Sequence, residues 1–108
     1  MSFNANVVEM SQQLENLESA LLNEYGYPAP HSAADTNNLM ICLAKIKGSA
    51  EAIADECEEA HDIVAECDDF RGSLIGQDGD PIDFDTGLGI ELGLKDRLAN
   101  LRVLIDNL

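Results

Sequence analysis

The chain has 108 residues, of which 21 are Asp or Glu and 6 are Lys or Arg, so its formal net charge is −15 with both histidines neutral. One domain is expected at this length, and an apolar content of 45% is enough for a single core. So acidic a chain is not expected to bind nucleic acid or an anionic membrane directly, because both require clustered Lys and Arg, and a partner protein should be basic.

Apolar residues at the start of the chain alternate in steps of four and three, the heptad pattern of a helix that packs against other helices. They are Phe3, Val7, Met10, Leu14, Leu17 and Leu21. The pattern predicts a first helix over residues 3–25. Gly26, Pro28 and Pro30 should end it, because glycine caps a helix in the left-handed conformation and proline cannot continue one.

A second helix is predicted over residues 33–70. Ser32 and Asp35 fit the capping-box pattern, which marks the start of a helix. Gly48 followed by Ser49 could break this helix into two, which would give four helices instead of three. Because the heptad phase continues through Gly48, we favour one continuous helix. Its apolar seam begins at Leu39 and continues through Leu43, Ile46, Ala50, Ile53, Cys57, Ala60, Val64 and Cys67.

Residues 72–87 are rich in Gly and Asp and predict an irregular loop or a short hairpin. Asp85 or Thr86 can cap a third helix over residues 88–107. Four aspartates of this loop, Asp78, Asp80, Asp83 and Asp85, invite a calcium site, but their order does not fit an EF-hand in any register, and a turn explains them. No internal repeat is apparent.

The predicted fold is all-α, a single domain over residues 1–108 in which three helices pack as an antiparallel, coiled-coil-like bundle. At 1.5 Å per residue, the second helix would be on the order of 55 Å long, and the other two about 35 and 30 Å. Neither of them can cover all of the second helix. We therefore expect a homodimer that covers the rest of the seam.

The negative charge is concentrated in one segment. Residues 48–70 hold nine acids and no Lys or Arg, whereas residues 87–108 are neutral overall. Exposed helices usually mix the two signs of charge, because like charges four residues apart are destabilising. Seven of the nine acids should point away from the core and form one stripe about 27 Å long; they are Glu51, Asp55, Glu58, Glu59, Asp62, Glu66 and Asp69.

One carboxylate per roughly 4 Å is similar to the spacing of phosphates along a nucleic-acid strand, about 3.4 Å. Our main hypothesis is therefore a non-enzymatic inhibitor that mimics nucleic acid and blocks a basic, nucleic-acid-binding surface of a partner protein. Small acidic phage proteins that act against restriction or CRISPR machinery provide an analogy based on charge layout alone. The alternative is a coiled-coil adaptor or oligomerisation module that works through its apolar seam.

A third class is a helical metal-binding protein, because Glu58 and His61 have the Glu-x-x-His spacing of helical di-iron sites. Only one such motif is present, and we expect no metal, cofactor or catalytic residue. The three cysteines form neither a CxxC pair nor an even-numbered disulfide framework. Free thiols, together with an N-terminus that resembles no signal peptide, lead us to expect a cytoplasmic protein.

Overall fold

The structure of the protein is a computed structural model that describes residues 3–108. These residues fold into five helices and no strand, with only three isolated β-bridges between them. The predicted all-α class is confirmed, whereas the count of three helices is wrong. The helices are α1 (Phe3–Leu21), α2 (Ala33–Ile53), α3 (Glu59–Ser73), α4 (Thr86–Glu91) and α5 (Leu94–Asp106).

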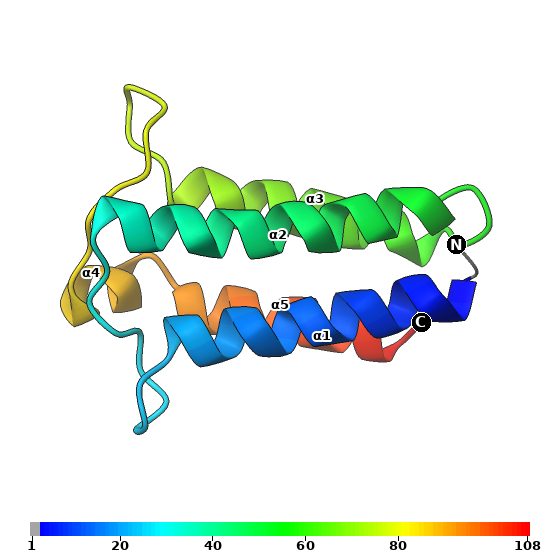
Figure 1. Cartoon of the computed structure of the whole chain (residues 1–108), viewed down its shortest axis with the longest axis horizontal. Coiled ribbons are helices and arrows are strands. Elements are labelled where there is room, and N and C mark those ends of the chain that lie inside the picture. Colours follow the sequence, from blue (N-terminus) through cyan, green and yellow to red (C-terminus); the bar gives the residue numbers. More distant parts are fainter. Residues whose placement is uncertain (1–2) are drawn as a thin grey trace.

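The four long helices run antiparallel to their neighbours, with α1 beside α2 in one layer and α5 beside α3 in the other (Figure 1). Each packs against two others, and the buried side chains between them include Met10, Leu43, Phe70 and Leu101. The α2–α3 turn, the start of α1 and the end of α5 lie at one end of the bundle. Two protruding hairpins and α4 lie at the opposite end.

Helix α1 ends four residues before the predicted limit because a tight hairpin follows it. The side chain of Asn23 accepts hydrogen bonds from the backbone N–H groups of Tyr25 and Tyr27, at 2.9 and 3.1 Å. Gly26 has a φ of 81° at the tip of this hairpin, which is the left-handed conformation that glycine adopts most easily. The predicted glycine conformation is therefore present, but in a turn beyond the helix.

The predicted continuous helix over residues 33–70 is wrong, and the break lies after Ile53, not at Gly48. The chain reverses through residues 54–58, where the backbone N–H groups of Glu56 and Cys57 both donate to the carbonyl of Ile53. Gly48 sits inside α2, and no heavy atom outside its own helix backbone and chain neighbours lies within 4 Å of where its Cβ would be. The N-cap is as predicted, because the Ser32 side chain accepts from the Asp35 N–H at 3.2 Å.

The reversal lets one chain cover its own apolar seam. Leu43, Ile46, Ala50, Ile53, Ala60 and Cys67 are buried within the bundle, while Cys57 and Val64 are half-buried. In α3 the buried positions are Ala60, Ile63, Cys67 and Phe70, so Ile63 takes the inward place predicted for Val64. The long uncovered stripe from which we expected a homodimer is not present.

The predicted helix over residues 88–107 is divided into α4 and α5. Asp85 caps α4, and its side chain accepts from the Leu88 N–H at 2.8 Å, so this predicted cap is confirmed. Gly93, with a φ of 68°, separates the two helices. The side chain of Arg97 donates to the carbonyl of Leu92, which caps the end of α4.

The structure contains an internal repeat that the sequence did not reveal. The hairpin after α1 recurs after α3, 53 positions later, with Gly79 in place of Gly26 and a φ of 83° in place of 81°. The bridge between Leu22 and Pro28 recurs as Ile75 with Pro81. The N-cap also recurs, with Asp85 in the place of Ser32. The chain thus consists of two helix–hairpin–helix halves that join through residues 54–58.

The two halves meet at a backbone joint between His31 and Phe84, which correspond under the same offset. Each donates its N–H to the carbonyl of the other, at 2.8 and 3.0 Å, and their rings stack with centroids 4.7 Å apart. On one side of this joint the side chain of Asp83 accepts from the Ala33 N–H, and the Thr36 hydroxyl donates to the carbonyl of Ile82. The joint fixes the hairpins against the first turn of α2.

Candidate acidic binding face

The seven carboxylates predicted to point away from the core do lie on the surface. We call them the acidic face; six are exposed and Glu66 is half-buried. They come from three segments, because Glu51 lies in α2, Asp55 in the turn, and the others at the start of α3 and along it. The members of the acidic face are Glu51, Asp55, Glu58, Glu59, Asp62, Glu66 and Asp69.

The break after Ile53 changes the shape of this face. From Glu58 to Asp69 the carboxylates follow one side of α3 for about 17 Å, at 1.5 Å per residue. Glu51 and Asp55 lie at the end of the antiparallel α2 and in the turn that joins it to α3. The predicted straight stripe of about 27 Å is therefore a shorter row with a cluster at the end of the bundle.

Glu56 is an exposed acid of the turn and is not one of the seven predicted members of the face. In one continuous helix, Glu56 would lie away from the predicted stripe. In the turn it lies between Asp55 and Glu58, so it joins Glu51 and Asp55 in the cluster, and residues 51–62 hold six acids in all. Only the position of the chain reversal could have revealed this.

The start of α3 explains part of the charge in structural terms. Helix N-termini favour negative charge, and the first turn of α3 contains Glu59 and Asp62. The pKa of Glu59 is lowered, first by a hydrogen bond from its own backbone N–H and then by one from the thiol of Cys57 at 3.2 Å. These two acids are therefore suited to the end of the helix that they occupy.

The helix dipole does not explain the charge of Glu51 at the end of α2. A helix C-terminus disfavours negative charge, yet Glu51 lies in the last turn of α2, which contains no basic residue. Within residues 3–108 the two ion pairs are Lys47–Asp68, at 2.8 Å, and Arg102–Glu18, at 2.6 Å. Neither includes a member of the acidic face. The local fold therefore does not account for all of the charge.

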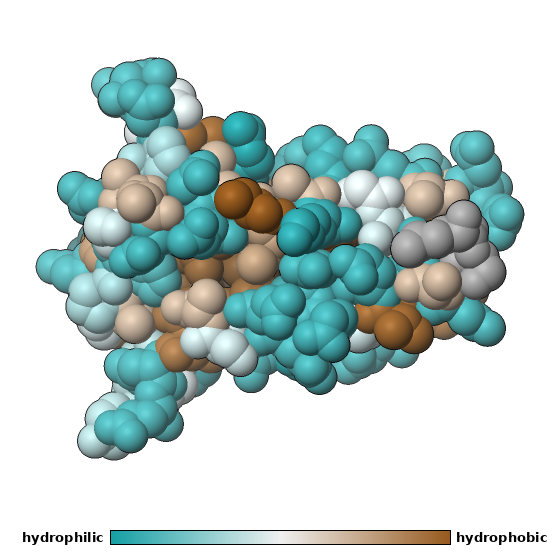
Figure 2. Space-filling model, in the orientation of Figure 1, coloured by the Kyte–Doolittle hydropathy of each residue, from teal (hydrophilic) through white to brown (hydrophobic). Residues whose placement is uncertain are grey.

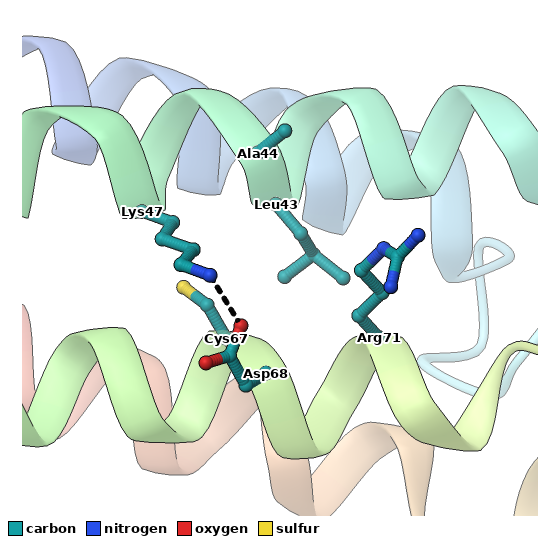
Figure 3. A pocket seen from close by; sticks show the side chains of 6 residues that line it. All are labelled: Leu43, Ala44, Lys47, Cys67, Asp68 and Arg71. Atoms are coloured by element: carbon teal, nitrogen blue, oxygen red, sulfur yellow. Dashed lines mark hydrogen bonds and ion pairs between the residues drawn. The ribbon is translucent and has the colours of Figure 1, made fainter.

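A cavity of about 180 Å³ lies beside the acidic face, between α2 and α3 (Figure 3). Lys47 and Asp68 are paired on one side of it, and Arg71 lies on the other side. Burial, and then the charges of Asp68 and Glu66, raise the pKa of the Cys67 thiol to about 12. A thiol held in this form is not a nucleophile at neutral pH.

The metal and calcium motifs do not gather into binding sites. No group of three His, Cys, Asp or Glu side chains suited to a metal ion occurs among the residues that the structure describes. Glu58 and His61 line a shallow surface depression with two other members of α3. In the second hairpin, the carboxylate of Asp78 accepts from the Asp80 N–H, and those of Asp83 and Asp85 also accept from backbone N–H groups.

Exposed apolar side chains on the long helices come from different helices, whereas Tyr27 and Ile90 line one cavity between the first hairpin and α4. The exposed ones include Val8 on α1, Ile41 on α2 and Val103 on α5. On the face drawn in Figure 2, hydrophilic residues cover most of the surface and separate the apolar patches. No helix within residues 3–108 has the length and apolar character to cross a membrane.

Comparisons of this chain with protein-family models, with curated proteins and with solved structures found no match.

Proposed function

We propose that the protein is a non-enzymatic inhibitor whose acidic face occupies a basic, nucleic-acid-binding surface of a partner protein. The observation that carries this proposal is a set of surface carboxylates that form no ion pair with any residue between positions 3 and 108. A basic groove would supply the missing positive charges, and the excess charge would speed the encounter. We place this activity in the cytoplasm, in keeping with the free thiols.

The arrangement of the carboxylates supports the proposal. The row along α3 resembles a short segment of one strand, and the cluster of the turn adds charge where the bundle ends. Glu51 lies where the helix dipole makes negative charge unfavourable, and within its helix it has only a through-space attraction to Lys47, so a role outside the fold would help to explain its presence. A partner whose Lys and Arg side chains bind nucleic acid could contact the row along α3 and the cluster of the turn at the same time.

The proposal is tested by removing three charges from the row without changing its shape. The variant Glu58→Gln, Asp62→Asn, Glu66→Gln should lose the partner while it keeps its helical circular dichroism. A matched control removes three exposed charges elsewhere, Glu15→Gln, Glu24→Gln and Glu91→Gln, and should keep the partner. Equal binding by both variants would contradict the proposal.

The partner is first captured with the immobilised protein at low and at high salt. A partner of the proposed kind is released at high salt and is displaced by an oligonucleotide duplex, because both act on the same electrostatic contacts. A partner that resists both treatments binds through other contacts. Such a result would exclude mimicry of nucleic acid.

The adaptor function and the homodimer require other surfaces than we expected. Within the chain, Ile53 and Ala60 are 2% and 0% exposed, so a partner could reach the seam only if the bundle opened. A homodimer would use the exterior of the bundle. Light scattering at micromolar concentration decides between a monomer and a dimer, and Ile53→Asp should abolish folding in either case.

A further inference from the structure

His31 is a buried histidine whose two ring nitrogens both face backbone carbonyls. The ring is 8% exposed and stacks on Phe84. Its Nδ1 lies 2.6 Å from the carbonyl oxygen of Ala29, and its Nε2 lies 3.0 Å from the carbonyl oxygen of Ala20. Both distances are those of hydrogen bonds.

Carbonyl oxygens only accept hydrogen bonds, so each ring nitrogen must carry a proton to bond with its partner. A neutral imidazole carries one N–H and one bare nitrogen, whichever tautomer forms. In the neutral ring one lone pair would therefore face a carbonyl oxygen at 2.6 or 3.0 Å. Only the imidazolium, with two N–H donors, satisfies both contacts.

The position of Ala20 gives a second reason. Its carbonyl belongs to the last turn of α1, where carbonyls lack partners within the helix and where positive charge is favourable. Two of its neighbours already have partners, because the Leu22 N–H donates to Glu18 and the Ala29 N–H donates to Leu21. An imidazolium at this point completes the end of α1.

The hydrogen-bonding partners and the stacking partner of the His31 ring carry no charge. The ionisable groups on the adjoining segments include the acids Glu18 on α1, Glu24 in the first hairpin, Asp35 on α2, and Asp83 and Asp85 on either side of Phe84, and the base Lys95 of α5, which lies over the ring of Tyr27. Glu18 is paired with Arg102, Asp83 accepts from the Ala33 N–H, and Asp85 caps α4. The acids favour a positive ring through space, whereas burial and Lys95 oppose it, so the two carbonyl contacts decide.

We infer that His31 is an imidazolium in the folded protein and that its ring is a proton-dependent latch between the end of α1 and the first hairpin, next to the joint between the two halves. Protonated, the ring ties the end of α1 to Ala29 of the first hairpin, while its backbone is paired with Phe84 of the second. Loss of the proton sets a lone pair against one carbonyl and loosens the hairpin. The hairpin carries the exposed side chains of Tyr25 and Tyr27, so its release would change that end of the molecule.

The second histidine of the chain provides an internal control, because His61 is exposed on α3. Nitrogen-15 NMR of the intact protein reports whether each ring nitrogen carries a proton. At the pH at which half of the His61 rings are neutral, His31 should still show two protonated nitrogens. A bare nitrogen on His31 at that pH would overturn the inference.

Stability gives an independent readout. A folded state that holds a proton more tightly than the unfolded chain is most stable at low pH and becomes less stable as the pH rises through the histidine range. The urea midpoint should therefore fall from pH 6 to pH 8. This window lies above the usual range of Asp and Glu and below that of the thiols.

The variant His31→Phe keeps an aromatic ring against Phe84 but carries no proton, so its midpoint should not fall across this window. The control His61→Gln should keep the fall of the wild-type protein. An equal fall in His31→Phe and wild type would contradict the latch. If His31→Phe does not fold, the nitrogen-15 NMR of the wild-type protein still tests whether both ring nitrogens of His31 carry a proton.

Discussion

Among single residues, two glycines with opposite surroundings test how tightly the structure is packed around them. A Cβ on Gly89 would lie 2.6 Å from Cβ of Pro28, whereas one on Gly48 would meet nothing within 4 Å. Overpacking costs about 1–3 kcal/mol, and alanine gains about 0.5–1 kcal/mol over glycine inside a helix. Gly89→Ala should lower the free energy of unfolding by about 1–2 kcal/mol, and Gly48→Ala should raise it by about 0.5–1 kcal/mol. Urea denaturation measures both, and equal effects would show that the Pro28 contact is not tight.

Cys67 should make the protein sensitive to alkaline pH. Burial raises the pKa of its thiol from 9.0 to about 12 in the folded state, while the unfolded chain has the ordinary value. The raised pKa contributes stability that is complete below about pH 9 and is lost as the pH rises toward 12. The loss is about 1.4 kcal/mol per pH unit in this window.

Cys67→Ala tests this directly. The variant should be less stable at pH 8, because it leaves a cavity, but its stability should fall less between pH 9 and pH 10. Cys42 serves as a comparison, because burial raises the pKa of its thiol too, against the opposing charge of Lys45. An unchanged slope in Cys67→Ala would contradict the burial of that thiol.

Among the helices, α2 and α3 place acids at opposite ends of their dipoles. Removing the charge of Glu51, in the last turn of α2, should stabilise the protein by about 0.3–1 kcal/mol. Removing that of Glu59, in the first turn of α3, should destabilise it. The two variants, Glu51→Gln and Glu59→Gln, carry the same net charge, so a difference in thermal midpoint reports position alone. Midpoints that both rise would instead indicate that repulsion among the acids of the whole molecule outweighs the effect of the helix dipoles.

The helices also show which part of the fold the sequence could predict. The heptad pattern correctly placed the buried face of α2 from Leu39 to Ile53, because a helix with one buried side must repeat in this way. The reversal after Ile53 could not be read, because residues 54–58 contain no Gly or Pro. The register shifts by one residue in α3, but Ile63 and Val64 are both apolar, so either register fits the sequence. The carboxylates were correctly placed on the surface, whereas their division between two helices depended on this break.

For the whole molecule, the net charge of −15 should oppose folding through repulsion between acids. Added salt screens this repulsion, so the thermal midpoint should rise between 10 and 500 mM NaCl. For a domain of this size, each 1 kcal/mol gained corresponds to about 4–8 °C. The Glu58→Gln, Asp62→Asn, Glu66→Gln variant should respond less than the wild-type protein. A midpoint that falls with salt would show that the two ion pairs outweigh the repulsion.

The relation between the two halves also lay beyond the sequence. Over the paired hairpins, identity is limited to a few positions such as Gly26 with Gly79 and Pro28 with Pro81, where the backbone conformation restricts the choice of residue. Elsewhere different side chains accept the same hydrogen bond from the backbone, as Ser32 and Asp85 do at the two N-caps. A repeat of backbone hydrogen bonds is visible only in three dimensions.

The location of the chain ends gives this repeat a consequence for connectivity. The start of α1 and the end of α5 lie at the same end of the bundle as the turn over residues 54–58 (Figure 1). A linker from the end of α5 to the start of α1, combined with a cut in that turn, would therefore reverse the order of the two halves along the chain. In such a circular permutant the polypeptide would begin with α3 and finish with α2, while the pairings between helices and the contact of His31 with Phe84 would be kept.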